Sequence, residues 1–136
     1  MKKIEARMIQ AVRKALNNAS LDGRVMKQAN TEVLQVHHGA AHNIGYYREI
    51  QVLLYGHTIA CVEPDINRIR LSDCGYRTVT TKSRLNALLG AFVPGEGISQ
   101  RDFEWFTSQG TWGGLDEFPV QLKADNFRLQ QAERLA

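Results

Sequence analysis

Apolar side chains near the start of the chain recur at the spacing of an amphipathic helix. Within residues 2–18, Ile4, Met8, Val12 and Leu16 lie four positions apart. This spacing places them along one side of a helix, and the opposite side is then rich in lysine and arginine. Lysines at the start of a helix oppose its dipole, at a cost of about 0.3–1 kcal/mol each at an exposed site. The pattern therefore predicts a surface helix with a basic outer side.

Short β-branched runs separated by turn residues follow this helix and predict antiparallel strands. The expected strands are residues 24–28, 31–37, 49–55, 58–62 and 68–72. Gly56–His57 is expected to form a tight hairpin turn, because glycine readily adopts the positive φ that such turns need. Proline, aspartate and asparagine between residues 64 and 67 predict the next turn. In the last strand Ile69 and Leu71 alternate with arginines, so apolar and basic side chains point to opposite faces.

The second half of the chain predicts two further helices and an aromatic strand. The expected elements are a helix over residues 82–92 capped by Thr80 or Thr81, a strand over residues 98–107, and a C-terminal helix over residues 120–135. Leu85, Leu88, Leu89 and Phe92 form the apolar stripe of the central helix. The glycine-rich stretch at 108–114 is expected to be irregular.

Together these elements predict an α+β fold, with an antiparallel sheet of about four to five strands and N-terminal, central and C-terminal helices. A length of 136 residues fits a single domain over residues 1–136. The apolar fraction of 43% and the charged fraction of 23% are typical of a globular chain rather than a disordered one. The chain has no signal-peptide pattern and no apolar run of bilayer length, and its two cysteines suit a reducing compartment. We therefore expect a cytoplasmic protein that does not enter a membrane.

Charge is distributed unevenly along the chain, although the net charge is only +3. Residues 1–14 and 66–84 are strongly basic, whereas residues 96–117 are acidic. Such asymmetry favours a partner of complementary charge or self-association, and it leaves the oligomeric state open, a homodimer included. An ordinary solvated surface is the alternative for any one cluster.

Several runs in the middle of the chain are similar to a group of small uncharacterised proteins encoded by tailed phages. The runs are NTEV at 30–33, LLYGHTIACVE at 53–63, RLSDCGYRTVTTKSRLNALL at 70–89 and ISQRDFEWF at 98–106. The most specific of them is TTKSRLNALL, and the resemblance covers residues 30–107. It implies a phage origin and a place of action in the host cytoplasm. It carries no assigned activity.

The start of the central helix is the strongest candidate binding site. A helix N-terminus presents free N–H groups and a partial positive charge, which suit a phosphate, and a tyrosine beside it can stack on a base. The candidate nucleic-acid-binding residues here are Arg68, Arg70, Tyr76, Arg77, Thr80, Thr81, Lys82 and Arg84. On the first helix, Lys3, Arg7 and Lys14 lie along one stripe and form a second candidate for a phosphate backbone. The alternative is a threonine-capped helix with solvated basic side chains.

An aromatic segment within the acidic region suggests a different function. Its candidate residues for binding a protein are Phe103, Trp105, Trp112 and Phe118. Exposed aromatic side chains in an acidic surround are typical of a protein-binding hot spot, whereas buried ones belong to the core. The second hypothesis is thus an inhibitor or regulator of a host protein, of use in host takeover or against host defence.

The sequence offers no support for an enzyme or a metalloprotein. It contains no GxSxG, HExxH or Walker motif, so we expect no catalytic residues and no cofactor. Of the histidines His37, His38, His42 and His57, the pair His38 and His42 has the spacing of metal ligands on a helix, but Gly39 and the loop-like composition argue against a helix there. The two cysteines show no recognised ligand spacing, so we expect no metal site. Between the two binding hypotheses we favour nucleic acid, because two basic clusters occur and one lies at a helix start.

Overall fold

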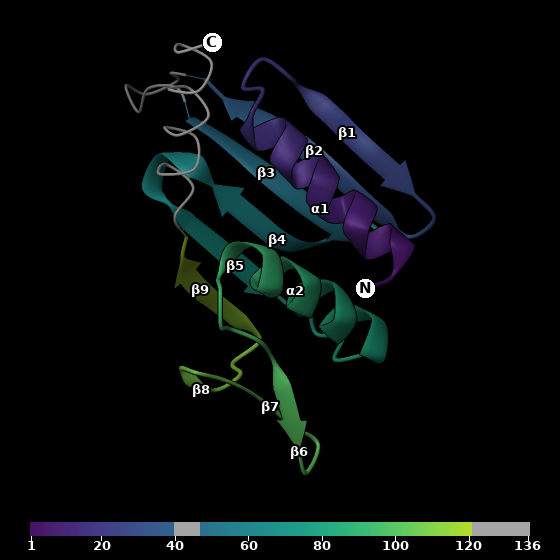
Figure 1. The fold of residues 1–136 in the computed structure, drawn as a ribbon, viewed down its shortest axis with the longest axis vertical. Helices are drawn as coiled ribbons and strands as arrows, with labels where there is room; N and C mark the ends of the chain where they lie inside the picture. The colour runs from purple at the N-terminus through teal and green to yellow at the C-terminus, as the bar shows by residue number, and fades with distance from the viewer. Residues whose placement is uncertain (40–46, 121–136) are drawn as a thin grey trace.

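Two helices lie on a large antiparallel sheet in the computed structural model, which describes residues 1–39 and 47–120 (Figure 1). The helices are α1 (Lys3–Leu16) and α2 (Val79–Phe92), and η2 (Pro64–Ile66) is a single 3₁₀ turn. The six-stranded sheet contains β1 (Gly23–Gln28), β2 (Thr31–His38), β3 (Tyr47–Leu54), β4 (His57–Glu63), β5 (Arg68–Ser72) and β9 (Leu115–Pro119), in that spatial order. A three-stranded sheet contains β6 (Ser99–Arg101), β7 (Glu104–Thr107) and β8 (Gly110–Thr111).

This architecture confirms the predicted α+β class, with more strands than the four or five expected. The predicted N-terminal helix is α1, and the five strands predicted between residues 24 and 72 are β1 to β5. From residue 121 onward, the predicted C-terminal helix at 120–135 lies outside the described residues.

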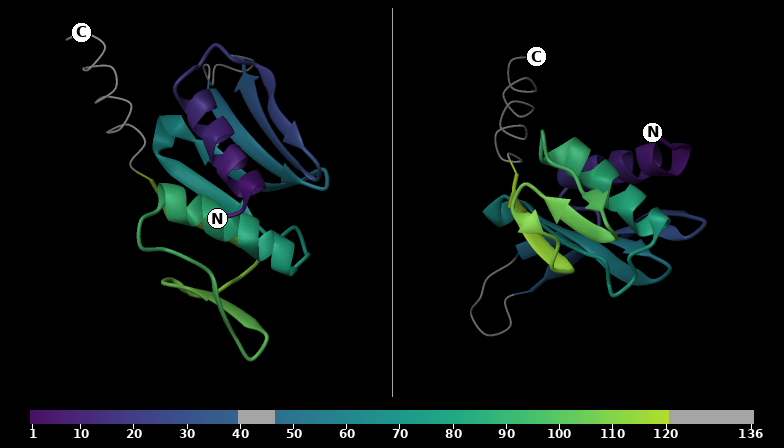
Figure 2. Two further views of the ribbon diagram at one scale, coloured as in Figure 1. Left: turned by 45° about the vertical axis from the view of Figure 1, so that its right-hand side comes forward. Right: turned by 90° about the horizontal axis from the view of Figure 1, so that it is seen from below.

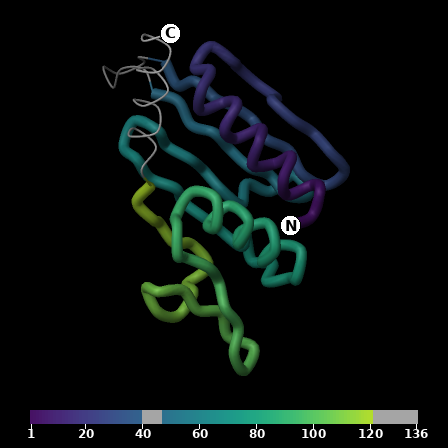
Figure 3. The backbone as a smooth tube through the Cα atoms, viewed as in Figure 1, coloured from purple at the N-terminus to yellow at the C-terminus, as the bar shows by residue number. Residues whose placement is uncertain are grey.

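Both helices cover the same face of the large sheet and run in the same direction (Figures 2 and 3). Glu5 of α1 contacts Arg84 of α2, and further along the same helices the Arg13 guanidinium lies 5.7 Å from the centre of the Phe92 ring. The two helices therefore begin at the same end of the molecule. The turns between β1 and β2, between β3 and β4, and before α2 lie at that end too (Figure 1).

The core lies between the helices and one face of the sheet. Val33, Val52, Val62 and Ile69 are completely buried, each on a different strand, and they face the helices. Because side chains alternate along a strand, the residues between them point to the other face of the sheet, which no described helix covers. That open face is largely polar, and it carries the charged side chains considered below.

A buried ion pair joins the two helices to each other and to the sheet. The Arg84 Nη1 atom donates to Glu5 Oε1 at 3.2 Å, and both residues are only 5% exposed. Ser83 also donates to this carboxylate oxygen, and Arg84 Nε donates to the Thr31 hydroxyl on β2 at 3.3 Å. The other carboxylate oxygen of Glu5 accepts from the backbone N–H of Lys2 at 3.4 Å. The pair is therefore held by hydrogen bonds from three elements, which such a buried pair needs to offset its desolvation.

A second, half-buried arginine fixes the far end of α1. Arg48 on β3 donates through Nη1 to the carbonyl of Ala15 at 2.8 Å and through Nη2 to that of Leu16 at 3.0 Å. Its Nη1 atom also donates to Gln35 Oε1 at 2.8 Å. The last carbonyls of a helix have no partner within it, and a cation there also suits the negative end of the helix dipole. Burial nevertheless lowers the pKa of Arg48 from its usual value.

The central helix begins earlier than its pattern predicted. It starts at Val79 rather than Lys82, and the capping residue is Thr78 rather than Thr80 or Thr81. The Thr78 hydroxyl accepts a hydrogen bond from the Thr81 N–H at 3.1 Å, while Thr78 itself has an extended backbone. Thr80 and Thr81 lie inside the helix, and Thr78, which precedes the first helical turn, keeps the extended backbone of a capping residue.

The aromatic segment folds as a hairpin, so the single strand predicted over residues 98–107 is wrong. Asp102 and Phe103 both have positive φ, 48° and 68°, and form a two-residue turn between β6 and β7. The predicted irregular stretch that follows contains β8. β9 was missed because only Phe118 of its five residues is buried and a proline ends it, a pattern that suits an edge strand.

The buried ion pair yields a test of how the helix layer is held. Replacing Glu5 with alanine leaves the Arg84 charge buried without a partner, and we expect a loss of about 3–5 kcal/mol in the free energy of unfolding. Replacing both, as Glu5→Leu with Arg84→Met, is expected to recover most of that loss, since no buried charge is then left without a partner. Urea denaturation measures both effects.

The matched control for this test is Gln10→Ala on the exposed side of the same helix. It is expected to change the free energy of unfolding by no more than about 0.5 kcal/mol. A Glu5→Ala protein as stable as the Gln10→Ala protein would show that the buried pair does not hold the helices.

Candidate functional site

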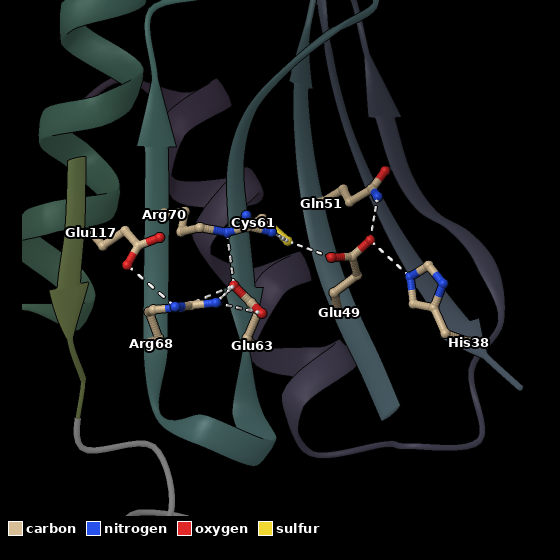
Figure 4. A network of polar contacts seen from close by, with 8 residues as sticks. All are labelled: His38, Glu49, Gln51, Cys61, Glu63, Arg68, Arg70 and Glu117. Carbon is tan, nitrogen blue, oxygen red and sulfur yellow. Dashed lines mark hydrogen bonds and ion pairs between the residues drawn. The ribbon is translucent and has the colours of Figure 1, made fainter. Parts of the chain in front are cut away.

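The arginines of β5 are tied to carboxylates on the neighbouring strands (Figure 4). Arg68 donates to both oxygens of Glu63 at 3.2 Å and to Glu117 at 3.2 Å. The Arg70 Nε atom lies 2.8 Å from Glu63 Oε1. The register explains these contacts, because Glu63 pairs directly with Arg68 across β4 and β5, and Glu117 pairs with Arg70 across β5 and β9. The first half of the predicted basic patch is therefore balanced by acids.

The same open face continues into a polar row across β4, β3 and β2. Glu49 accepts hydrogen bonds from Cys61 at 2.7 Å, from Gln51 at 2.8 Å and from His38 at 2.9 Å. Burial alone raises the pKa of Glu49, but the three hydrogen bonds outweigh it and lower that pKa below its usual value. For Cys61, burial and the adjacent Glu49 carboxylate both raise the pKa, to about 12. The thiol therefore acts as a hydrogen-bond donor in this row and not as a nucleophile.

The second half of the predicted patch is divided between the core and a loop. Arg84 and Thr81 are buried, and Arg84 is paired with Glu5 as described above. Arg77 donates through Nε to Asp73 Oδ2 at 3.1 Å and lies 6.0 Å from the centre of the Trp105 ring. Tyr76, in contrast, is exposed beside the start of α2. Of the predicted residues at this helix start, Tyr76 and Arg77 are exposed and Thr80 and Lys82 are half-buried, and Arg77 is paired with Asp73.

The outer side of α1 keeps its basic side chains free of acids. Lys3, Arg7 and Lys14 are all exposed, and their spacing places them along one stripe of about 16 Å. Arg7 donates to the neutral side chain of Gln28 at 2.8 Å. Among the described residues, none of the three lies within 4.0 Å of a carboxylate. The single acid of this helix, Glu5, is turned inward.

Three of the four predicted protein-binding aromatic residues lie in the core. Trp105, Trp112 and Phe118 are at most 2% exposed, so their rings present no surface to a partner. Trp112 donates through its indole N–H to Asp73 at 2.9 Å, which attaches the small sheet to the loop before α2. Phe103 is 92% exposed at the turn between β6 and β7.

The acids that pair with the arginines are the functional neighbours that sequence reasoning missed. They are Glu5, Glu63, Asp73 and Glu117. A signal existed for Glu63, since the tight turn at residues 64–67 sets it opposite Arg68, and for Asp73, which lies four residues before Arg77. The contacts of Glu5 with Arg84 and of Glu117 with Arg68 join residues distant in the sequence and depend on the tertiary fold.

Over residues 1–39 and 47–120, no group of three or more histidine, cysteine or acidic side chains is placed to hold a metal ion. His42 lies outside the described residues. No helix in the described part of the chain is long and apolar enough to cross a membrane.

Residues 1–126 match the family described as Kyanoviridae Gp96 protein, and the chain belongs to this family of phage proteins. The predicted phage origin is thereby confirmed. Neither the curated proteins nor the solved structures contain a significant match to the chain.

The two cysteines are predicted to differ sharply in reactivity. Cys74 is half-exposed, whereas Cys61 is buried with a pKa raised to about 12. Because the thiolate is the reactive form, iodoacetamide at pH 8 is expected to modify Cys74 within minutes and to leave Cys61 unmodified in the native protein. Mass spectrometry of the native and urea-unfolded protein measures this. Fast modification of Cys61 in native Cys74→Ser protein would contradict the described network.

Proposed function

We propose that this phage protein binds nucleic acid without catalysis, through the outer side of α1. The observation that carries the proposal is the exposed stripe of Lys3, Arg7 and Lys14, which has no carboxylate partner among the described residues. A stripe of free cations suits a phosphate backbone, since each neutralised phosphate releases a counterion. The place of action is then the cytoplasm of the infected host cell.

The position of these cations supports a role beyond stability. Lys3 begins α1, where a positive charge opposes the helix dipole. Several arginines elsewhere in the described residues do lie within 4.0 Å of a carboxylate, among them Arg68, Arg70, Arg77 and Arg84. Uncompensated charge on one helix raises the local positive potential, which attracts an anionic partner at long range.

Lys82, in the first turn of α2, is a further cation without a carboxylate partner among the described residues. It is half-exposed and contacts a neutral side chain, donating to Gln100 at 3.4 Å. The two helices begin at the same end of the molecule, so their positive dipole ends add to the field of Lys3 and Lys82 there. Four other predicted cations are balanced by acids and are expected to contribute less to binding: Arg68, Arg70, Arg77 and Arg84.

The direct test compares free and paired cations. We expect wild-type protein to bind single-stranded DNA at low salt, with affinity that falls steeply as salt rises. Replacing Lys3, Arg7 and Lys14 together with glutamine is expected to weaken binding and to reduce the slope of log K against log salt by about 2. Fluorescence anisotropy with a labelled oligonucleotide measures both quantities.

The matched control replaces Arg68 and Arg70 with glutamine, which removes two cations that carboxylates already balance. This variant is expected to keep most of the wild-type affinity and slope. If the control loses as much affinity as the α1 variant, the helix is not the binding surface. If wild-type protein binds neither DNA nor RNA at low salt, the proposed function is wrong.

A second candidate function is binding of a host protein as an inhibitor or regulator. It is favoured by Phe103, which projects 92% exposed from a tight turn between two acidic residues, Asp102 and Glu104. An aromatic ring on a rigid hairpin is a typical anchor for a protein pocket. This hypothesis now depends on one ring, because the other three candidate aromatic residues are buried.

The test of this second candidate is a pull-down from host lysate with wild-type and Phe103→Asn protein. Asparagine tolerates the positive φ of this position, so the hairpin is expected to persist without its ring. The candidate predicts a host protein that wild-type captures and Phe103→Asn loses. Identical sets of captured proteins would argue against it.

A further inference from the structure

A pocket of about 260 Å³ opens at the end of the molecule where both helices begin. It is lined by Leu54, Tyr55, His57, Ile59, Asp73, Cys74, Tyr76, Thr78 and Thr81. The walls come from the turn between β3 and β4, the loop before α2, and the first turn of α2. Its volume lies just below the range of drug-sized ligand pockets, which begins at about 300 Å³. A small flat group fits such a space.

The mouth of the pocket is aromatic and accessible. Tyr55 is 69% exposed and Tyr76 is 56% exposed, and the rings of Tyr76 and His57 lie 5.4 Å apart. Exposed aromatic rings around an apolar pocket are suited to stacking on a flat heterocycle. The single acid in the lining, Asp73, accepts hydrogen bonds from Gly75, Arg77 and Trp112, so its charge is already satisfied.

The backbone at Tyr55 is unusual for an aromatic residue. Its φ is 51°, and that of Gly56 is 81°, which is the geometry of the two-residue turns that favour Asn-Gly. A bulky side chain in this region costs free energy that asparagine or glycine would avoid. Tyr55 therefore lines the pocket from a turn position at which asparagine or glycine is favoured.

Groups that suit a phosphate lie beside the pocket. The first N–H groups of a helix have no partner within it, and at the start of α2 those of Val79 and Thr80 follow the Thr78 cap directly. Lys82 lies in the same first turn. A single nucleotide carries both groups, a base that suits the pocket and a phosphate that suits the start of α2.

We propose that this pocket receives a single unpaired base of a nucleic acid strand, whose backbone continues along α1. The inference rests on the proposed function and adds the class of ligand, which is single-stranded nucleic acid. In a duplex the bases are stacked and paired inside the helix, so the pocket gives no affinity for duplex DNA. In this arrangement the stripe on α1 binds phosphates and the pocket binds the base.

The experiment measures affinity for oligothymidylate and for an abasic oligonucleotide of the same length. Wild-type protein is expected to bind the base-containing strand on the order of tenfold more tightly than the abasic one, since stacking of one base on an aromatic ring contributes that much. Tyr55→Asn is expected to remove this difference. The variant creates the preferred Asn-Gly turn, so it is expected to be at least as stable as wild-type protein.

A second variant and a control separate the pocket from general surface effects. Tyr76→Ala is expected to weaken binding of oligothymidylate and to leave the abasic strand unaffected. Tyr47→Ala is the control, because this exposed tyrosine stacks on His38 at the start of β3, away from the pocket lining. In all three variants the salt slope is expected to stay at its wild-type value, because no cation is removed.

Modification of Cys74 gives an independent readout, because this thiol lines the pocket. Oligothymidylate is expected to slow its reaction with iodoacetamide, and the abasic strand is expected to leave the rate unchanged.

Each outcome decides a different claim. Equal wild-type affinity for the two strands, or equal losses of Tyr55→Asn on both, would overturn the pocket inference while the α1 proposal stands. Failure of wild-type protein to bind either strand at low salt would remove both. A tenfold difference that only the pocket variants abolish supports the inference.

Discussion

The buried contact between Glu5 and Arg84 determines both the packing of the helix layer and its charge. It joins α1 to α2 at 3.2 Å and reaches β2 through Thr31, so it aligns the two helices on the sheet. Because Glu5 is the single acid of α1, turning it inward leaves the outer side of the helix with cations alone. A structural requirement of the core thus leaves an uncompensated basic surface. The same alignment brings the starts of both helices to one end of the molecule.

The arginines of β5 are paired with acids, whereas the cations on the outer side of α1 have no carboxylate partner among the described residues. On the open face of the sheet, Glu63 and Glu117 balance the arginines of β5, and Glu49 is the acceptor for a row of donors. Exposed ion pairs contribute about 0–1 kcal/mol each, so their main effect here is to cancel the field of the arginines. The cations without a carboxylate partner among the described residues include Lys3, Arg7 and Lys14 on α1 and Lys82 at the start of α2.

The local elements were predictable from sequence, whereas their long-range partners were not. The four-residue spacing of Ile4, Met8 and Val12 predicted α1, and the alternation of apolar and basic residues around Ile69 predicted β5. Burial of one side of an element places its apolar residues at a regular spacing in the sequence. The turn at Asp102–Phe103 was not predicted, because aspartate tolerates positive φ but phenylalanine is not a typical residue for the second position of such a turn. The predicted patch included Arg84 for its charge, but only the packing of α1 shows that a carboxylate encloses it. The sequence shows which residues are cationic, but it does not show which of them lack a carboxylate partner in the folded protein.

The central claim is that free cations, rather than all cations, define the binding surface. Two-dimensional NMR of the labelled protein, titrated with single-stranded oligonucleotide at low salt, tests it residue by residue. If the free cations bind the strand, amide shifts are concentrated on the exposed side of α1 and around Tyr55 and Tyr76, and the signals of Arg68 and Arg70 do not change. Shifts centred on β5 and the open face of the sheet, without shifts on α1, would contradict binding by the free cations.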